Sequence, residues 1–308
     1  MRDAFAKTLT ALAKEDPRVV LLSGDIGNRM YNNFKEACPE RFFNCGVAEA
    51  NMTGVAAGMA LCGLRPFTYT ITPFVTTRCL EQIRVDVCYH NAPVTIVAVG
   101  AGYSYATLGA THHACEDIAF LRALPGMKVI CPGDAVEVRE AVKAILAQDS
   151  PVYLRLGKKG EPVVHTEIPE FEIGKGIVIK EGNDVCLLNT GITLPISLEA
   201  GFELGKRGIS AKVVNLHTVK PLDDSLLSSV FSTFPVVATV EEHSLIGGLG
   251  GAVAEWMGDQ HPIQSRLCRI GSPDVFQHNT GSQAFVRNQI GLTPQAIAER
   301  VETFLRQN

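Results

Sequence analysis

Three short segments place polar side chains where the surrounding sequence is apolar: Ser23–Gly27, Gly46–Glu49 and Gly109–His113. Each follows a predicted β-strand in the chain. Ligands of α/β proteins bind beyond the carboxyl ends of parallel strands. The three segments are therefore the candidates for a functional site.

Glu49 and His112 are the side chains in these segments that are best suited to proton transfer. Glu49 opens the segment 48–62, whose other polar side chains are only Asn51 and Thr53. Its carboxylate is either a solvated group in a first helical turn, favoured by the helix dipole, or a buried group that shares a proton. His112 is likewise either a polar loop residue or an acid–base group that works near neutral pH. The residues alone leave both alternatives open.

The glycine and cysteine patterns do not indicate a further site. The run Gly247–Gly251 lacks a later acidic partner at the spacing of a dinucleotide site, which favours a packing role. The nine cysteines are scattered, without metal-binding spacing, and are interpreted as reduced packing residues of a cytoplasmic protein. No metal site is expected from this chain alone.

The elements that must position these residues alternate between short apolar runs and helical patterns, which indicates an α/β fold with mainly parallel sheets. In the first half, strands are predicted at 19–23, 42–45, 66–70, 94–99, 128–131 and 152–156, and helices at 49–62, 74–90, 116–124 and 135–148. In the second half, strands are predicted at 184–189, 211–216, 236–241 and 266–270, and helices at 194–207, 223–231, 249–257 and from Pro294 onward.

These elements predict two doubly wound α/β domains separated by a linker. The stretch 161–175 contains Pro162 and Pro169, mixed charge and no periodicity, which is typical of a connection between domains. The expected division is a first domain at 1–160, the linker at 161–175 and a second domain at 176–308.

Composition restricts the class of partner. The 308 residues are 46% hydrophobic and 19% charged, with a net charge of −4. Such a chain suits an ordinary globular protein and presents no broad basic surface for nucleic acid or an anionic membrane. No apolar run is long enough to cross a membrane and the N-terminus lacks the core of a signal peptide, so a cytoplasmic location is expected.

The ordered set of segments resembles the C-terminal half of transketolases over nearly the whole chain. The matching segments are 23–25, 46–52, 109–113, 116–119, 121–127, 151–157, 220–223 and 241–250. The resemblance implies a pyrimidine-binding thiamine diphosphate domain followed by a transketolase C-terminal domain. It also implies transfer of a two-carbon ketol unit from a ketose donor to an aldose acceptor.

The resemblance assigns roles to five residues of the first domain. Glu49 matches the glutamate that shares a proton with N1′ of the aminopyrimidine ring, and so promotes proton removal from C2 of the cofactor. Phe74 matches an aromatic residue that stacks on this ring, and Ile71 stands where many members have a second aromatic side chain. Asp25 matches an acidic residue of the cofactor pocket, and His112 matches a histidine near the reacting carbons.

Two departures from the family concern the substrate. Gly100 stands where sugar-phosphate transketolases have a substrate-contacting histidine, and Leu108 stands where they have an aspartate. Arg155 and Lys158 remain as candidate contacts for an anionic group. The resemblance therefore implies preserved cofactor chemistry with an altered sugar substrate.

The sequence contains no Gly-Asp-Gly motif, which in this family binds the Mg²⁺ (or Ca²⁺) that holds the diphosphate. The resemblance therefore implies a separate N-terminal subunit that supplies this half of the site, and an α₂β₂ heterotetramer. Two alternatives stay open: the β subunit of a 2-oxoacid dehydrogenase decarboxylating component, and a non-catalytic subunit. A 1-deoxyxylulose-5-phosphate-synthase-like enzyme and a nicotinamide-dependent dehydrogenase fit the chain less well.

Overall fold

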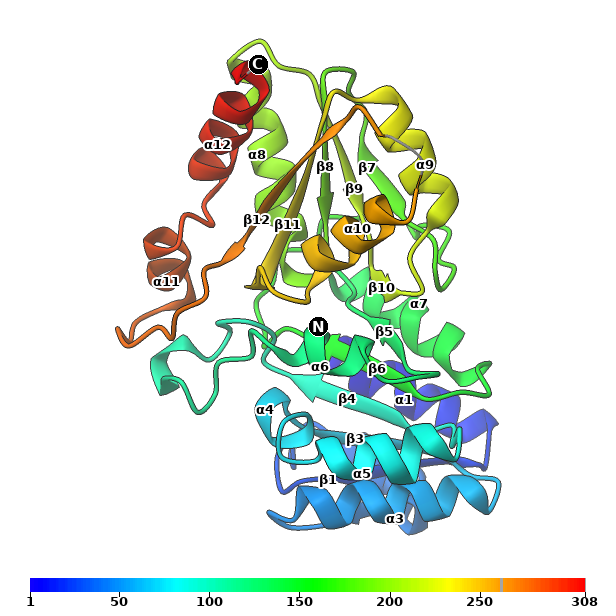
Figure 1. Cartoon of the computed structure of the whole chain (residues 1–308). Helices are drawn as coiled ribbons and strands as arrows, with labels where there is room; N and C mark the ends of the chain where they lie inside the picture. Colours follow the sequence, from blue (N-terminus) through cyan, green and yellow to red (C-terminus); the bar gives the residue numbers. More distant parts are fainter. Residues whose placement is uncertain (261–262, 308) are drawn as a thin grey trace.

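The computed structural model describes residues 1–260 and 263–307 and contains two α/β units stacked one above the other (Figure 1). Each unit has a sheet at its centre and helices on both faces. The strands of the first sheet are β1 (Val19–Ser23), β2 (Phe42–Asn44), β3 (Arg65–Ile71), β4 (Thr95–Val99), β5 (Lys128–Ile130), β6 (Val152–Leu156) and β10 (Thr218–Lys220). Their order is β10-β5-β6-β4-β3-β1-β2, and every pair is parallel except β10 with β5.

The second sheet has the strand order β12-β11-β8-β9-β7. Its strands are β7 (Ile177–Lys180), β8 (Val185–Asn189), β9 (Ala211–Asn215), β11 (Val236–Ser244) and β12 (Arg266–Ser272). Only β7 runs antiparallel to its neighbour. The predicted class of two α/β units with mainly parallel sheets is therefore confirmed. The exact limits of the domains and linker stay a prediction.

Helices cover both faces of each sheet. In the first unit they are α1 (Arg2–Glu15), α2 (Asn32–Ala37), α3 (Glu49–Leu61), α4 (Thr72–Val75), α5 (Leu80–Gln82), α6 (Asp117–Arg122) and α7 (Ala135–Leu146). In the second unit they are α8 (Leu194–Lys206), α9 (Asp224–Thr233), α10 (Leu249–Gly258), α11 (Gln283–Gln289) and α12 (Pro294–Arg306). Short 3₁₀ turns at Pro39–Arg41, Ala106–Leu108 and Gly191–Thr193 complete the described elements.

The predicted helix 74–90 is divided into three pieces. After α4 and α5 the chain continues as a π-helical segment, Ile83–Tyr89. The hydroxyl of Thr76 donates a hydrogen bond to the carbonyl of Thr72 (2.7 Å) at the end of α4. Such side-chain bonds compete with helix continuation. The interruption places Arg78 on a turn that faces the edge of the sheet.

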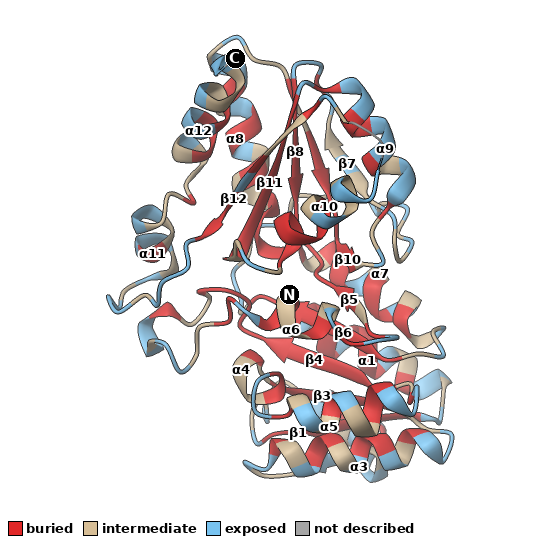
Figure 2. Ribbon diagram, in the orientation of Figure 1, coloured by how far each residue is buried: buried red, intermediate tan, exposed pale blue. Residues whose placement is uncertain are grey.

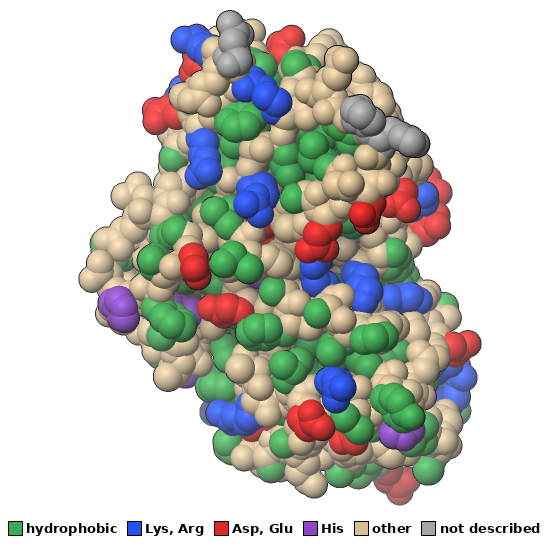
Figure 3. Space-filling model, in the orientation of Figure 1, with side chains coloured by type: hydrophobic (Ala, Val, Ile, Leu, Met, Phe, Trp, Pro, Cys, Tyr) green, Lys and Arg blue, Asp and Glu red, His purple; other side chains and the backbone are tan. Residues whose placement is uncertain are grey.

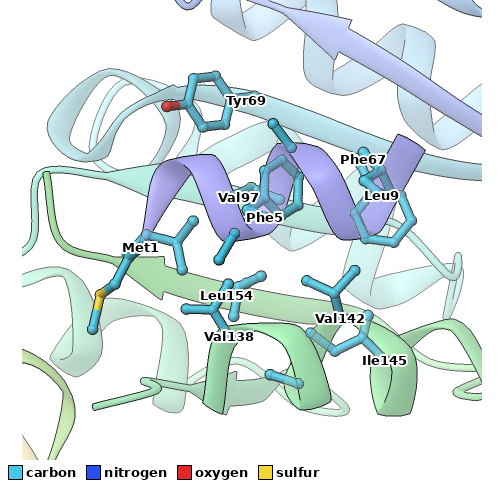
Figure 4. Close-up of a cluster of buried hydrophobic side chains, with 14 of the residues drawn as sticks. Met1, Phe5, Leu9, Phe67, Tyr69, Val97, Val138, Val142, Ile145 and Leu154 are labelled. Carbon is cyan, nitrogen blue, oxygen red and sulfur yellow. The ribbon is translucent and has the colours of Figure 1, made fainter. Parts of the chain in front are cut away.

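Helix α1 and strands β7 and β10 were not predicted from the sequence. Phe5 and Leu9 of α1, at helical spacing, pack against Phe67 and Tyr69 of β3 and against the buried face of α7 (Figure 4). Because α1 supplies one face of the first core, it is an integral part of the first unit. The central strands of both sheets are the most thoroughly buried elements, whereas the edge strands β2 and β7 and the outer faces of the helices are more exposed (Figure 2).

The two units are joined by more than one connection. Strand β10 belongs by sequence to the second half, yet it pairs with β5 of the first sheet. None of the helices in the described part of the chain is long and apolar enough to span a membrane. On the face drawn in Figure 3, charged side chains of both signs are interspersed with hydrophobic ones over both units.

Candidate active site

The segments singled out by sequence meet at one edge of the first sheet. Strands β2, β1, β3 and β4 are consecutive neighbours, and Ser23 is in register with both Asn44 and Tyr69. Because these strands are parallel, the loops at their carboxyl ends lie together. This arrangement brings the loop after β1, the start of α3, the start of α4 and the loop after β4 into one site.

Glu49 is the buried acid of this site. It lies at the first position of α3 and is 2% exposed. A Cβ atom on Gly24 would lie 3.3 Å from Cγ of Glu49 and 3.1 Å from Thr70, so the loop after β1 approaches closely because residue 24 is glycine. The hydroxyl of Thr70, also buried, has no hydrogen-bond partner among the described residues. Of the two alternatives for Glu49, the structure therefore selects the buried one.

Arg78 contacts both Glu49 and Phe74. Its Nη1 donates to Oε2 of Glu49 at 2.7 Å, and its guanidinium carbon lies 4.6 Å from the centre of the Phe74 ring. The Arg78 side chain is 48% exposed, whereas Glu49 is sheltered. A planar cation thus lies on the aromatic face and donates to the carboxylate at the same time.

His112 completes a row of rings with Phe74 and Tyr105. The imidazole packs edge-on against Phe74, with 5.2 Å between ring centres, and lies 6.2 Å from the ring of Tyr105. Nδ1 of His112 is 2.9 Å from the hydroxyl of Thr111. Burial, and then the neighbouring His113, lower the pKa of His112 below its usual value. The neutral imidazole, which both donates and accepts, is therefore the main form at neutral pH.

Tyr105 fills the space beside Gly100. A Cβ atom on Gly100 would lie only 2.3 Å from Cδ2 of Tyr105, and the glycine has a φ of 97°. A histidine at position 100 would require movement of both the ring and the backbone. Nζ of Lys158 lies over the ring of Tyr105, 4.8 Å from its centre, and Leu108 is exposed on the same loop as Tyr105.

Asp25 and Ile71 differ in exposure and in the element that carries them: Asp25 is on the loop after β1, and Ile71 ends β3. Asp25 is exposed, adopts a positive φ of 57° and accepts a hydrogen bond from Asn44 at 2.8 Å. The hydrogen bonds from Asn44 and then Asn28 lower the pKa of its carboxyl group. Ile71 is half-buried, at the end of β3, and packs against the first core. The structure thus leaves Asp25 accessible and gives Ile71 a partly structural role.

Arg155 requires a correction. The sequence suggested an anion contact for it, but its side chain is 1% exposed and forms a buried ion pair with Asp117 (Nε to Oδ2, 2.6 Å). It also donates to the carbonyls of Ala114 (2.7 Å) and Glu242 (3.2 Å). Position 155 lies within β6, whose side chains are all buried. Because its donors are used inside the protein, Arg155 is a structural residue, and of the two cations only Lys158, which contacts Tyr105, stays a candidate anion contact.

Arg78 and Tyr105 belong to the site but were not predicted from the sequence. Arg78 follows Phe74 by four residues, the spacing at which side chains meet on a helix, so a signal for this contact was present. For Tyr105 no spacing rule applies, because its contact with Gly100 depends on how the loop after β4 folds back.

Comparisons with known proteins agree with this geometry. The family description "Transketolase, pyrimidine binding domain" matches residues 1–161, and "Transketolase, C-terminal domain" matches residues 174–297. The chain is 38% identical over 304 residues to a putative transketolase C-terminal section of Methanocaldococcus jannaschii, covering 98% of this chain and 95% of that protein. It is 39% identical to the 6-deoxy-6-sulfo-D-fructose transketolase subunit SqwH of Clostridium sp., covering 96% of this chain and 92% of that protein.

A further relative and a solved structure extend this likeness. The chain is 34% identical to a subunit of the apulose-4-phosphate transketolase of Phocaeicola vulgatus, covering 99% of this chain and 97% of that protein. The solved structure of a split-gene transketolase, described as an inactive beta4 tetramer, is 39% identical, with a TM-score of 0.89, covering 99% of this chain and 97% of that one.

The fold and site define the pyrimidine-binding half of a thiamine diphosphate enzyme. The chain belongs to the transketolase family, and it corresponds to the C-terminal subunit of a split transketolase.

Proposed function

We propose that this chain is one subunit of a two-chain enzyme that transfers a two-carbon ketol unit from a ketose to an aldose with thiamine diphosphate. The observation that carries the proposal is the buried Glu49 at the carboxyl edge of the first sheet, beside Phe74 and His112. Relatives of similar length are named as transketolase subunits, which supports the same class of reaction.

The residues present fit the aminopyrimidine end of the cofactor. Arg78 shows that a flat group with N–H donors can lie on Phe74 while it donates to Glu49, at 4.6 Å and 2.7 Å respectively. An aminopyrimidine ring has the same planar shape and can use both partners once Arg78 moves. The unpartnered Thr70 hydroxyl next to Gly24 supplies another polar atom at this place. When bound, thiamine diphosphate supplies a carbon nucleophile and an electron sink for breaking the bond beside the ketose carbonyl.

The side chains of this chain would manage protons around that chemistry. Glu49 holds a proton at the ring nitrogen, which water cannot readily remove because the carboxyl group is buried. His112 packs edge-on against Phe74 and, as a neutral imidazole, would donate to or accept from a substrate oxygen. Asp25 is exposed on the loop after β1, where it would be accessible to the cofactor.

We place the metal and the diphosphate on an N-terminal partner subunit, with Mg²⁺ (or Ca²⁺) as the ion. Within residues 1–260 and 263–307, no group of three metal-ligating side chains lies close enough to hold an ion. Exposed apolar side chains lie just before Glu49, at Val47, and further along α3, at Val55 and Leu61. Such side chains suit burial against a second chain. An α₂β₂ heterotetramer in the cytoplasm is the proposed working form.

Reconstitution tests this proposal. The chain is purified alone and together with the candidate N-terminal subunit, and ketol transfer and cofactor binding are measured with Mg²⁺ present. We expect activity and tight thiamine diphosphate binding only in the mixture, which should sediment as a heterotetramer. Tight cofactor binding by the isolated chain would contradict the division of the site.

We also propose that the sugar substrate differs from that of ordinary sugar-phosphate transketolases. Tyr105 takes the space of the missing histidine at Gly100, and the exposed Leu108 supplies no hydroxyl partner. Lys158 remains as the candidate anion contact. Steady-state kinetics with a panel of phosphorylated, sulfonated and uncharged ketoses test this point. Rates with xylulose 5-phosphate and ribose 5-phosphate equal to those of a standard transketolase would overturn it.

A further inference from the structure

The loop that carries His112 is closed at its base. We call residues 102–114 the His112 loop. Gly102 and Ala114 exchange two backbone hydrogen bonds, at 3.0 and 2.9 Å, so that the two ends of the loop lie side by side. The segment between them contains Tyr105, Leu108 and His112. The position of His112 therefore depends on the contacts that hold the two ends of the loop in place.

Glu242 of the second unit holds the first end of the loop. It lies near the end of β11, and its side chain is fully buried. Its Oε1 accepts from the backbone N–H of Tyr103 at 2.6 Å and from Nε2 of Gln283 at 2.8 Å, and its Oε2 accepts from Nε of Arg287. Both oxygens are thus used, and every partner is a donor.

The fit between Glu242 and the loop is close. Gly102 has a φ of 56°, and a Cβ atom there would lie 2.6 Å from Cγ and Oε1 of Glu242. A side chain at position 102 would therefore displace the carboxylate. The ring of Tyr103 adds a second bond to the same unit, since its hydroxyl is 2.6 Å from that of Ser272 on β12. In Figure 1 the loop lies beside α11, which carries Arg287 and Gln283.

Arg155 holds the second end. Its Nη2 donates to the carbonyl of Ala114 and to the backbone carbonyl of Glu242, so a single guanidinium joins the loop to β11. Asp117 fixes the orientation of that guanidinium by ion pairing. The backbone N–H of Ser244 donates to the carbonyl of Cys115 at 2.7 Å, immediately after the loop. Both ends of the His112 loop are therefore fastened to the same strand of the second unit.

We propose that the second unit acts in the reaction by positioning His112, and that Glu242 is the positioning residue that does so from the second sheet without touching substrate or cofactor. This inference rests on the proposed function, because it assigns His112 to the substrate. We call the bonds that Glu242 and Arg155 make to the His112 loop the clamp. The cofactor residues Glu49 and Phe74 lie on other elements, α3 and α4, and the contact of Phe74 with the loop is the edge-on packing of His112. Loosening the clamp therefore weakens use of the substrate and leaves binding of the cofactor unchanged.

Glu241 provides a matched control next to Glu242. It is equally buried and belongs to the same strand. Its oxygens accept from the backbone N–H groups of Leu249 (2.7 Å) and Gly250 (2.8 Å) at the start of α10, away from the His112 loop. Replacement of either glutamate by glutamine removes a buried carboxylate from β11. Only at position 242 does the new amide N–H₂ face the donors that hold the loop.

The experiment compares Glu242→Gln and Glu241→Gln in the complex reconstituted with the N-terminal subunit. For Glu242→Gln we expect kcat/KM for the ketose to fall about 10- to 100-fold, because small displacements of a catalytic group have effects of this size. We expect the Kd of thiamine diphosphate to stay within about twofold of the original and hydrogen exchange in 103–114 to increase. For Glu241→Gln we expect a lower melting temperature, with kcat/KM and exchange in 103–114 close to the original.

Two results would overturn the inference: an unchanged kcat/KM for Glu242→Gln, or equal losses in both variants that follow their melting temperatures. If Glu242→Gln does not fold, Gln283→Ala removes one donor from the same carboxylate and should give a smaller loss of kcat/KM with the same rise in exchange. An original complex that binds the cofactor but transfers no ketol unit would instead refute the proposed function. The exchange measurement would then still report whether Glu242 holds the loop.

Discussion

Two regions of the molecule contain paired charged groups, and the pairs differ in their exposure to solvent and in the number of bonds they make. At the carboxyl edge of the first sheet, Glu49 has one ionic partner, Arg78, which is half exposed. At the seam between the two units, Asp117, Arg155 and Glu242 are buried, and each makes several short bonds to side chains and backbone. Both regions contain a carboxylate paired with an arginine. Only at the seam are the hydrogen-bonding atoms of these groups saturated by other groups of the protein.

This difference separates groups that can change partners from groups that cannot. An ion pair open to water contributes little to stability, because solvent competes for both ions. A buried pair is strongly destabilising when one partner is removed, since the other charge stays uncompensated. The edge is therefore suited to exchanging Arg78 for a ligand, whereas the seam is suited to holding the units and the His112 loop in place.

The largest effect is expected at the edge. Glu49→Gln keeps the shape of the side chain but removes the acid, so the ring nitrogen has no group with which to share a proton. We expect turnover of the reconstituted enzyme to fall about 10³-fold or more, equivalent to roughly 4 kcal/mol in activation free energy. Glu81→Gln, at an exposed position on α5, is the control and should be nearly neutral. Near-normal turnover of Glu49→Gln would defeat the assignment.

The seam should show the largest effect on folding. Arg155→Met leaves Asp117 buried without its charge partner, and we expect the free energy of unfolding to drop by about 3–5 kcal/mol in urea titrations. Lys143→Met breaks the exposed Lys143–Glu140 pair on α7 and should change stability by less than about 0.5 kcal/mol. The same small effect of both substitutions would contradict the view that the buried pair at the seam contributes more to stability than an exposed pair does.

Mild acid should also weaken the seam. Burial lowers the pKa of His243 to about 4, with Asp117, Arg155 and Glu241 beside it. In the unfolded chain the pKa is near 6.5, so the unfolded state binds the proton first. The contribution of His243 to stability is then complete above pH 6.5 and falls as the pH drops towards 4, by up to about 3 kcal/mol, whereas the raised pKa of Glu241, about 7, acts in the opposite direction. Unfolding titrations at pH 7.5 and 4.5 measure the loss, which His243→Asn should reduce. A loss of the same size in His243→Asn would assign the acid sensitivity to other groups.

The smallest effect is expected at Arg78. Because the guanidinium of Arg78 is half exposed to water while it bonds the buried Glu49, displacing it costs the cofactor only about 0.5–1 kcal/mol. Arg78→Met should therefore lower the Kd of thiamine diphosphate about two- to fivefold in the reconstituted complex, as measured by fluorescence titration. The exposed Arg84 offers the control Arg84→Met, which should leave the Kd unchanged. Weaker binding by Arg78→Met would show that Arg78 assists the cofactor instead of occupying its place.

The sequence was informative where the signal is local or where whole segments match a family. The strands that end at the site are predicted because short apolar runs alternate with helical patterns. Glu49 and His112 lie within segments that match the family, and Phe74 was assigned as the match of a family aromatic residue. Helix α1 was missed, although Phe5 and Leu9 have helical spacing, because the small and charged residues between them weaken the apolar pattern. Strand β10 was missed because three residues give no periodicity.

The case of Arg155 shows that position along a strand is not enough to predict whether a side chain faces solvent. Arg155 and Lys158 are three residues apart, and both are cations at the end of β6. The sequence cannot tell which of them faces solvent, because that depends on where Asp117 and the carbonyls of Ala114 and Glu242 lie in space. The family resemblance suggested both cations as substrate contacts. The structure shows that one of them, Arg155, is buried and paired inside the protein.

By itself, the sequence determined the α/β architecture and the family, and it singled out Glu49 as the candidate acid for the cofactor, because these inferences depend on periodicity and on contiguous motifs. Only the tertiary structure decided that Arg78 lies on Phe74, that Tyr105 fills the space at Gly100 and that Glu242 holds the His112 loop. Glu242 and Tyr103 are 139 residues apart in the chain. A hydrogen bond over that separation follows from the packing of two sheets, and no local pattern encodes it.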